Sequence, residues 1–241
     1  MGAGLAFQAA QERYSRQDLI VLNYHVHIPL PDPMVNPATL KRQEYYSVRS
    51  SPSYAFGGEI DGGGGSADSA KSIFDTKVEP KIAKMLAERP GANISVKASA
   101  TGTSVKVRAQ VSKVTSTSDK LRLHIALAED SVTYSGENGE RFHPVVVRSM
   151  ALDASSAQGF ALKPGKGGTF EYTFDVAKAV ADAKAHLEDY ETNTRKGAYS
   201  FREKKHDIKG GLVVVAFVQD DATKKILQSV YVKPAVTKAS K

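Results

Sequence analysis

The chain has 241 residues and a mass of 25.9 kDa, enough for one large domain or two ordinary ones. Hydrophobic residues make up 41% and charged residues 24%, which excludes wholesale disorder. Cysteine is absent, so this chain offers no disulfide, no thiolate nucleophile and no zinc–cysteine site. No apolar run approaches the ~20 residues that span a bilayer, and no signal-peptide pattern opens the sequence.

The net charge of +7 is unevenly distributed along the chain. Residues 1–93 hold ten basic and ten acidic side chains, whereas residues 94–241 hold 23 and 16. These later lysines are spread along alternating patterns, without an arginine-rich run or interleaved aromatic residues. The pattern favours a solvated basic face over a nucleic-acid interface.

The first ninety residues alternate helical and extended patterns, which is typical of an α/β layer. Asn36 before Pro37 predicts a capped helix start, because asparagine accepts from the first turn and proline suits the first helical position. The predicted elements are a helix at 5–14, a strand at 19–28, a helix from 37 to about 46, a strand at 53–56, a loop at 57–66 and a helix at 67–88.

Beyond Pro90 the apolar residues recur with period two, which predicts strands with one buried face. One helix, capped by Asp175, is expected at about 176–196, and a hairpin turn at 220–224. The expected fold class is α+β, with an α/β layer at 1–91, an antiparallel sandwich at 92–234 and a basic tail at 235–241. The seven predicted strands are 94–98, 105–111, 121–127, 142–147, 169–174, 212–218 and 226–232.

The stretch 24–37, Tyr-His-Val-His-Ile-Pro-Leu-Pro-Asp-Pro-Met-Val-Asn-Pro, is distinctive, as are Arg42, 45–48 and 51–53. Together they resemble the bacterial thioredoxin-like proteins of the Omp28-like group, and 141–148 and 212–221 resemble the β-domain appended to them. The resemblance implies a thioredoxin-like domain truncated at its N-terminus, an immunoglobulin-like sandwich and an extracytoplasmic location. The residues that carry the family motif loop are Tyr24, His25, His27, Pro29, Asp32 and Pro33.

The chain departs from this family in its chemistry. Redox-active members carry Cys-x-x-Cys at the start of the first helix, and here the first strand and both cysteines are missing. Two interpretations fit. In the first, this is a non-catalytic protein that acts in protein binding or as a structural or assembly subunit. In the second, it is a fragment of a thiol-disulfide oxidoreductase whose Cys-x-x-Cys lies upstream.

Pro52 matches the position where thioredoxin folds place a cis proline, so the resemblance predicts a cis Ser51–Pro52 bond. In the family this turn pairs with extended peptide, which makes Ser51, Pro52 and Ser53 the candidate peptide-binding turn. A retained structural turn is the favoured interpretation.

His25 and His27 stand two apart in a predicted strand, so their rings would share one face. With Asp32 or His143 they could bind zinc, but the spacing is unspecific and fixes no third ligand. A hydrogen-bonded role in positioning the proline loop is favoured, and no metal or cofactor is expected. The glycines at 62–65 lack the Gly-Lys-Ser/Thr ending of a phosphate loop, and no catalytic residue is assigned.

The missing first strand would leave the predicted strand 19–28 with an unpaired edge. Exposed strand edges are templates for pairing with another chain. The expected partner is therefore a protein, either another protein or a second copy in a homo-oligomer.

The absence of cysteine generates a direct test of activity. The purified chain should show no dithiol-dependent insulin reduction and no disulfide isomerase activity, because no thiolate is present to attack a disulfide. Turbidity in the insulin assay that rises above the buffer blank, and survives controls for contaminants, would contradict this expectation.

Overall fold

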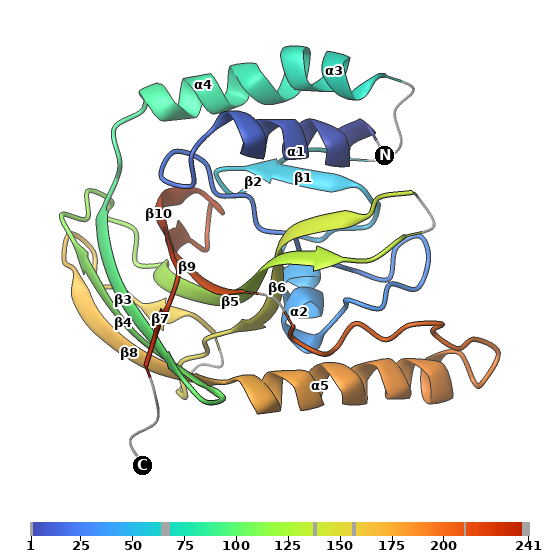
Figure 1. Cartoon of the computed structure of the whole chain (residues 1–241). Helices are drawn as coiled ribbons and strands as arrows, with labels where there is room; N and C mark the ends of the chain where they lie inside the picture. Colours follow the sequence, from blue (N-terminus) through green and yellow to red (C-terminus); the bar gives the residue numbers. More distant parts are fainter. Residues whose placement is uncertain (1, 64–67, 137–138, 156–157, 210, 238–241) are drawn as a thin grey trace.

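The computed structural model describes residues 2–63, 68–136, 139–155, 158–209 and 211–237 (Figure 1). The helical elements are α1 (Gly2–Arg13), α2 (Pro37–Tyr45), α3 (Ala70–Ile73), the π-helical turn η1 (Phe74–Val78), α4 (Glu79–Ala87), α5 (Val176–Asp189) and the π-helical turn η2 (Tyr190–Thr194). The strands are β1 (Ser53–Phe56), β2 (Glu59–Gly63), β3 (Asn93–Thr101), β4 (Ser104–Ser112), β5 (Leu121–Thr133), β6 (Phe142–Met150), β7 (Phe160–Ala161), β8 (Gly168–Asp175), β9 (Leu212–Asp220), β10 (Ile226–Val232) and β11 (Ala235–Val236).

Two sheets form the body of the molecule, antiparallel except that β11 pairs with β3 in parallel, and the coarse α+β prediction is confirmed. One sheet has the order β10-β9-β5-β6, with β7 pairing β5, and the other has the order β11-β3-β4-β8. Each of the seven strands predicted after Pro90 is present, as β3, β4, β5, β6, β8, β9 and β10. The period-two pattern was sufficient here because each strand has at least one face in an apolar core.

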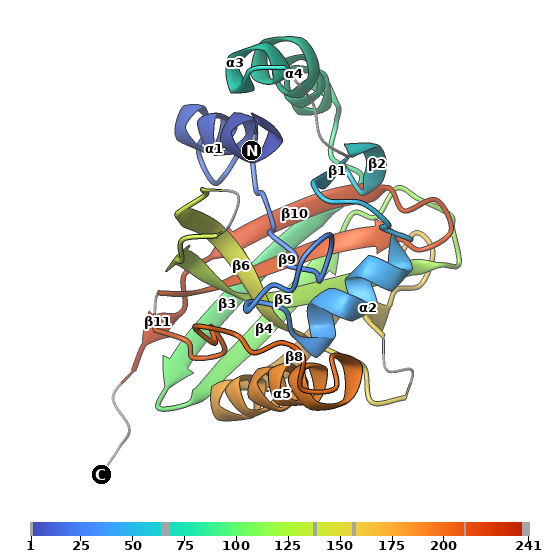
Figure 2. The same ribbon diagram turned by 90° about the vertical axis from the view of Figure 1, so that its right-hand side faces the viewer.

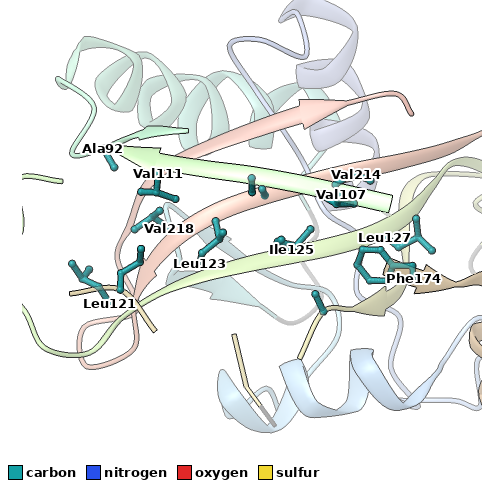
Figure 3. Packing of buried hydrophobic residues seen from close by; sticks show 14 of the residues in the cluster. Ala92, Val107, Val111, Leu121, Leu123, Ile125, Leu127, Phe174, Val214 and Val218 are labelled. Atoms are coloured by element: carbon teal, nitrogen blue, oxygen red, sulfur yellow. The ribbon is translucent and has the colours of Figure 1, made fainter. Parts of the chain in front are cut away.

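The main core lies between the two sheets (Figure 3). Val105, Val107, Ala109 and Val111 of β4 face this core. The odd-numbered apolar residues of β5 face it too, as do the even-numbered apolar residues of β9. These inward-facing residues of β5 and β9 are Leu121, Leu123, Ile125, Leu127, Val214, Ala216 and Val218, all at most 1% exposed. The two sheets therefore pack face to face as layers of one unit.

The opposite face of the β5–β9 sheet is also apolar. Ala126, Ala128, Val213, Val215 and Phe217 are buried on it. The covering layer comes from the N-terminal part of the chain, through Ile20, Leu22, Tyr24 and Ala38. Figure 2 shows α2 lying across this face, with α5 beside it. Residues 20–48 thus pack on the sheet that the C-terminal strands build.

The predicted strand 19–28 is wrong. This segment makes one isolated parallel bridge, Asn23 with Val146, through the bonds Asn23 N to Val145 O and Val147 N to Asn23 O, both 3.0 Å. Its apolar residues instead cover the sheet face, so the near-continuous apolar run reflects packing rather than a ladder on both sides. The segment lies against the edge of β6, and the unpaired edge expected at 19–28 is not formed.

Four further segments differ from the sequence expectations. Residues 59–63, predicted as loop, pair with β1 as a hairpin, and residues 64–67 lie outside the described part. The single helix predicted at 67–88 is divided into α3, η1 and α4, and the helix predicted at 176–196 into α5 and η2. Ala235–Val236 in the predicted tail pairs with β3 as the short strand β11. The Ser51–Pro52 peptide bond is cis, as predicted.

The start of α2 fixes this helix to the sheet. The Asn36 side chain accepts from the backbone N–H groups of Ala38 and Thr39, at 3.1 and 3.2 Å. Its Nδ2 donates to Val147 O at 2.8 Å, and Asn36 is only 1% exposed. One side chain therefore caps the helix and ties it to β6. Asp175, predicted as the cap of α5, accepts from Lys178 N at 3.0 Å at an exposed site.

This double role predicts different costs for the two caps. Asn36→Ala should lower the free energy of unfolding by about 2–3 kcal/mol, because it removes the cap and leaves the buried Val147 carbonyl without its donor. Asp175→Ala is the matched control and should cost about 1 kcal/mol, since only an exposed cap is lost. Urea denaturation followed by circular dichroism measures both, and equal losses would show that the Asn36–Val147 bond contributes nothing.

Candidate functional site

A groove of about 510 Å³ opens between α2, α5 and the outer face of the β5–β6 sheet. Apolar residues from all three sides line it: Pro37, Ala38, Met150, Ala151, Leu152 and Ala179. Polar side chains also line it: Asn36, Lys41, Arg42, Glu44, Tyr45, His124, Arg148, Ser149, Gln158, Asp182 and Asp221. Successive side chains of β5 point to opposite faces of the sheet, so Arg122 and His124 lie on the same outer face as Ala126. They make this end of the outer face polar.

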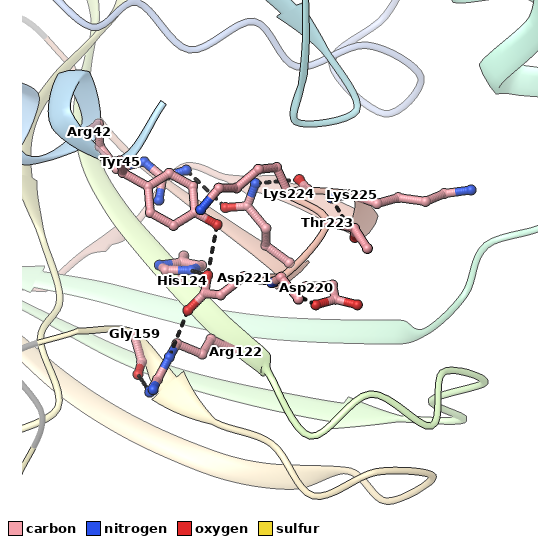
Figure 4. A network of polar contacts seen from close by, with 12 residues as sticks. Arg42, Tyr45, Arg122, His124, Gly159, Asp220, Asp221, Thr223, Lys224 and Lys225 are labelled. Atoms are coloured by element: carbon pink, nitrogen blue, oxygen red, sulfur yellow. Dashed lines mark hydrogen bonds and ion pairs between the residues drawn. The ribbon is translucent and has the colours of Figure 1, made fainter. Parts of the chain in front are cut away.

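Asp221 organises the polar end of the groove (Figure 4). Its Oδ1 accepts from the Tyr45 hydroxyl at 2.8 Å, and its Oδ2 accepts from Arg122 Nε at 2.8 Å. His124 Nε2 lies 3.5 Å from Asp221 Oδ1, and the His124 ring stacks on Phe217 with 5.1 Å between ring centres. The Asp221 carboxylate, in the turn between β9 and β10, therefore links Arg122 of β5 to Tyr45 of α2.

The protonation states in this cluster follow from its contacts. Burial alone would raise the pKa of Asp221, but the His124 and Tyr45 contacts and the Arg122 charge outweigh it and lower this pKa to about 2. Burial lowers the pKa of His124, so its neutral form is favoured. Burial, and then the Asp221 hydrogen bond, raise the pKa of Tyr45. At neutral pH the cluster holds one carboxylate, one neutral imidazole and one phenol.

Arg42 stands beside this cluster and is 6% exposed. Its Nη2 donates to Tyr46 Oη at 2.8 Å and to Gln219 Oε1 at 2.9 Å. Its guanidinium carbon lies 4.3 Å from the Tyr45 ring centre and 4.7 Å from that of Tyr46, as in cation–π contacts. These contacts hold a buried cation, and they link α2 to β9.

Unpartnered polar atoms are concentrated at the groove. Among the described residues, three buried side-chain nitrogens lack a hydrogen bond of normal geometry: Arg42 Nε, His206 Nδ1 and His124 Nε2, which has only the long 3.5 Å contact with Asp221 Oδ1. Two of these three residues line the groove. Since buried donors are nearly always paired in folded proteins, the groove has capacity for a group that supplies acceptor oxygens.

A second hollow, of about 430 Å³, lies on the outer face of β3, β4 and β8. Lys97, Lys106 and Arg108 line it, and Arg108 is paired with Glu171, both side chains more than half exposed. These are the solvated lysines that the charge pattern predicted. A pocket of exposed, solvated side chains offers no buried group to a ligand.

His25 and His27, which the sequence placed on one face of a strand, have different ring partners in the structure. His25 Nδ1 lies 2.7 Å from Asp32 Oδ2, and its ring is 5.2 Å from that of His143. His27 Nδ1 accepts from Asp32 N at 3.1 Å, while its Nε2 lies 3.1 Å from His186 Nε2 on α5. Both histidines thus hold the proline loop through Asp32. The described residues contain no group of three or more His, Cys, Asp or Glu side chains arranged to hold a metal ion.

The other motif residues have structural contacts. Tyr24 lies under Arg42, 5.8 Å from ring centre to guanidinium, and burial raises its pKa to about 12. Ile28–Pro29 is cis, and Pro33 O accepts from Lys205 N at 3.2 Å. Ser51, Pro52 and Ser53 lead into β1, and none of the three lines the groove. The candidate peptide-binding turn and the groove are separate places.

Sequence reasoning missed His124 and Asp221. Asp221 was interpreted only as a turn residue, and its partner Tyr45 is 176 positions away. The β5 segment held a signal that could have identified His124, because this polar residue lies in a run whose other members are almost all buried. A polar side chain at such a position needs a partner, and the search for one would have pointed to acidic residues nearby in space.

Comparison with known proteins shows similarity of fold alone. No protein-family model matches the chain, and no curated protein matches it in sequence. HBP35 of Porphyromonas gingivalis is 13% identical with a TM-score of 0.53, over 84% of this chain and 59% of that structure. This chain therefore spans about three fifths of the HBP35 structure.

Protein AGR_C_4864 from Agrobacterium tumefaciens is 15% identical with a TM-score of 0.52, over 100% of this chain and 90% of that one. A domain of the outer membrane lipoprotein Omp28 from Porphyromonas gingivalis is 18% identical over 61% of this chain and 98% of that domain. Its TM-score of 0.35 is too low to support an argument. The neighbours thus include HBP35 and an Omp28 domain at low identity.

The Asp221 cluster predicts a pH dependence of stability. Because the pKa of Asp221 is about 2 in the folded chain and 3.8 ordinarily, its contribution is complete above about pH 4 and is lost as the pH falls toward 2. Asp221→Asn should cost about 1 kcal/mol at neutral pH, after allowance for solvent screening. This difference from the wild type should shrink toward pH 2.

Urea denaturation at a series of pH values measures this difference. Asp119→Asn is the control, since Asp119 forms an ion pair with Lys120 and both side chains are well exposed. It should change the unfolding free energy by only a few tenths of a kcal/mol. A penalty for Asp221→Asn that is independent of pH would show that the cluster does not hold this carboxylate ionised.

Proposed function

We propose that this chain is a non-catalytic binding protein whose groove between α2 and α5 receives an extended segment of another polypeptide. One observation carries the proposal: three buried side-chain nitrogens of the described residues lack a hydrogen bond of normal geometry, and two of them, Arg42 Nε and His124 Nε2, belong to residues that line this groove. Leaving such groups unpaired costs about 1–3 kcal/mol each, and a ligand oxygen would recover part of that cost.

The composition of the groove suits a peptide. Its volume of about 510 Å³ is in the range of ordinary ligand sites, and its walls supply apolar contacts beside a few polar groups. A peptide offers carbonyl oxygens at regular intervals and apolar side chains between them. Lys41 stands with Glu44 and Asp182 at the rim, so the groove has no excess of positive charge that would favour nucleic acid.

The family relationship belongs to the same proposal. The hairpin β1–β2, with α1 and α3–α4, would be a reduced thioredoxin-like layer, and the two packed sheets would be the immunoglobulin-like sandwich of an Omp28-like protein. The motif at 24–37 and the absence of cysteine support a member that binds without redox catalysis. An extracytoplasmic location follows from this relationship.

Among the helices of the described residues, none is long and apolar enough to cross a bilayer.

The groove is tested with peptides displayed on phage. Random 12-residue peptides selected on the wild-type chain are synthesised with a fluorescent label, and their affinity is measured by fluorescence polarisation. Asp182→Trp places a large ring at the groove wall and should weaken binding about tenfold or more, since a bulky side chain there would exclude the peptide. Competition by the unlabelled peptide confirms that binding is specific.

The matched control is Ala181→Trp, an exposed position next to Asp182 on α5 that does not line the groove. It should leave the affinity unchanged, and both variants should keep the wild-type melting temperature. Selected peptides that bind Asp182→Trp as tightly as the wild type would place the binding surface elsewhere.

A further inference from the structure

We propose that the contact between His27 and His186 is an acid-sensitive latch that holds the C-terminal half of α5 in place and loosens when a proton binds. This proposal rests on the proposed groove for its functional meaning, because α5 forms one wall of that groove. The latch itself is a property of the described contacts and can be tested without a ligand.

The hydrogen bonds fix the tautomer of each ring. The backbone N–H of Asp32 points at His27 Nδ1, at 3.1 Å, so this nitrogen carries a lone pair and the His27 proton is on Nε2. That proton is donated to His186 Nε2 at 3.1 Å, so the proton of His186 is on Nδ1. Both rings are neutral in this arrangement, and the contact requires the lone pair on His186 Nε2.

The same tautomers argue against a metal ion between the rings. A metal bridging the two Nε2 atoms would need lone pairs on both, and the His27 proton would have to move to Nδ1. The Asp32 N–H occupies the Nδ1 side, at 3.1 Å. Proton binding is thus the chemistry that this pair is arranged to sense.

The groups around the pair include one aromatic ring and two carboxylates, each of which also has other contacts. Tyr190 stacks on His27, with 3.9 Å between ring centres. The Asp32 carboxylate already accepts from Met34 N at 2.8 Å and contacts His25 at 2.7 Å. Asp189, on α5 after His186, accepts from Asn193 Nδ2.

Glu191 on η2 faces the loop beyond this pair. It accepts from Phe201 N at 2.7 Å and is paired with Lys204 at 2.9 Å. The charges of Asp32 and Asp189 favour a proton on His27 and His186 respectively, but burial outweighs both and lowers the two pKa values.

A proton on His186 Nε2 would remove the acceptor of this contact and would face the His27 Nε2–H. A proton on His27 Nδ1 would leave the bond to His186 in place but would face the Asp32 N–H and break the contact of His27 with the proline loop. Burial, and then His186, lower the pKa of His27 to about 4, and burial lowers the pKa of His186. Because these pKa values lie below the ordinary 6.5, the closed form is favoured at neutral pH and is lost as the pH falls from about 6.5 toward 4.

The latch and the groove share one helix. His186 lies one turn after Asp182 and about two turns after Ala179, the two α5 residues that line the groove. The N-terminal end of α5 continues directly from β8 and is capped by Asp175. Loosening of the C-terminal half of α5 would therefore reach the groove wall at Asp182, one turn away, and acid would weaken ligand binding.

The test uses the absence of cysteine. Leu30→Cys in the proline loop and Ala185→Cys on α5, both exposed positions, carry nitroxide spin labels, and their separation is measured by double electron–electron resonance. We expect one short distance at about pH 7.5 and a second, longer population at about pH 5, with the ratio of open to closed rising about tenfold or more. A distance distribution unchanged over this range overturns the latch.

His186→Gln is the decisive variant, since its amide oxygen can still accept from His27 Nε2 but cannot bind a proton in this range. It should largely suppress the acid-induced population, while His206→Gln, a histidine outside the pair, should behave as the wild type. A His186→Gln chain that opens with acid as the wild type does overturns the proposal. If this variant does not fold, the pH titration of the wild-type spin-label distances decides. The latch requires the open population to rise with a midpoint between about pH 4 and 6.5.

Binding of the phage-selected peptides at the same two pH values separates the two proposals. The wild-type affinity should fall about fivefold or more from pH 7.5 to pH 5, and that of His186→Gln should change much less. If no peptide binds at pH 7.5, the groove proposal fails while the spin-label result still decides the latch. If peptides bind equally at both pH values although the helix opens, the link between latch and groove is wrong.

Discussion

The sheet β10-β9-β5-β6 is apolar on both faces, and this constraint determines the arrangement of the rest of the chain. Leu123 and Ile125 face one side, while Ala126 and Phe217 face the other. Burying both sides requires two covering layers, because each exposed face would leave several large side chains in water. The second sheet provides one layer. The segment 20–48 provides the other, and so the N-terminal third of the chain is bound to the C-terminal strands.

That second covering layer is polar in part, and its polar contacts are few and long-range. Arg42 and Tyr46 bond to Gln219, Tyr45 to Asp221, and Asn36 to Val147 O. The buried ion pair of Arg148 with Glu129 plays a similar role for the loop before β9, since Arg148 Nη1 donates to Lys205 O at 2.7 Å. Such pairs add little to stability by themselves, but they fix which segment lies where, because the loss of one partner leaves a buried charge.

The groove and the latch both arise where these covering elements meet. The helices α2 and α5 approach the sheet at the polar end of β5, where Arg122 and His124 replace the alanines found farther along its outer face. Small side chains such as Ala38 and Ala179 leave space there, and the histidine pair fastens the far end of α5 to the proline loop. In the two proposals, one helix both forms a wall of the groove and carries His186, so the groove would respond to the proton concentration.

The sequence by itself determined the seven later strands, the helix starts at Asn36 and Asp175, and the absence of thiol chemistry. These are local properties: a period of two along a half-buried strand, a side chain that reaches its own first turn, and a residue type that is missing. The tertiary structure alone decided that residues 19–28 lie on a sheet face with one bridge, that residues 59–63 pair in a hairpin, and that Tyr45 meets Asp221. An apolar run shows that a segment is buried but not against what, and contacts across 176 residues depend on which layers meet once the sheets have packed.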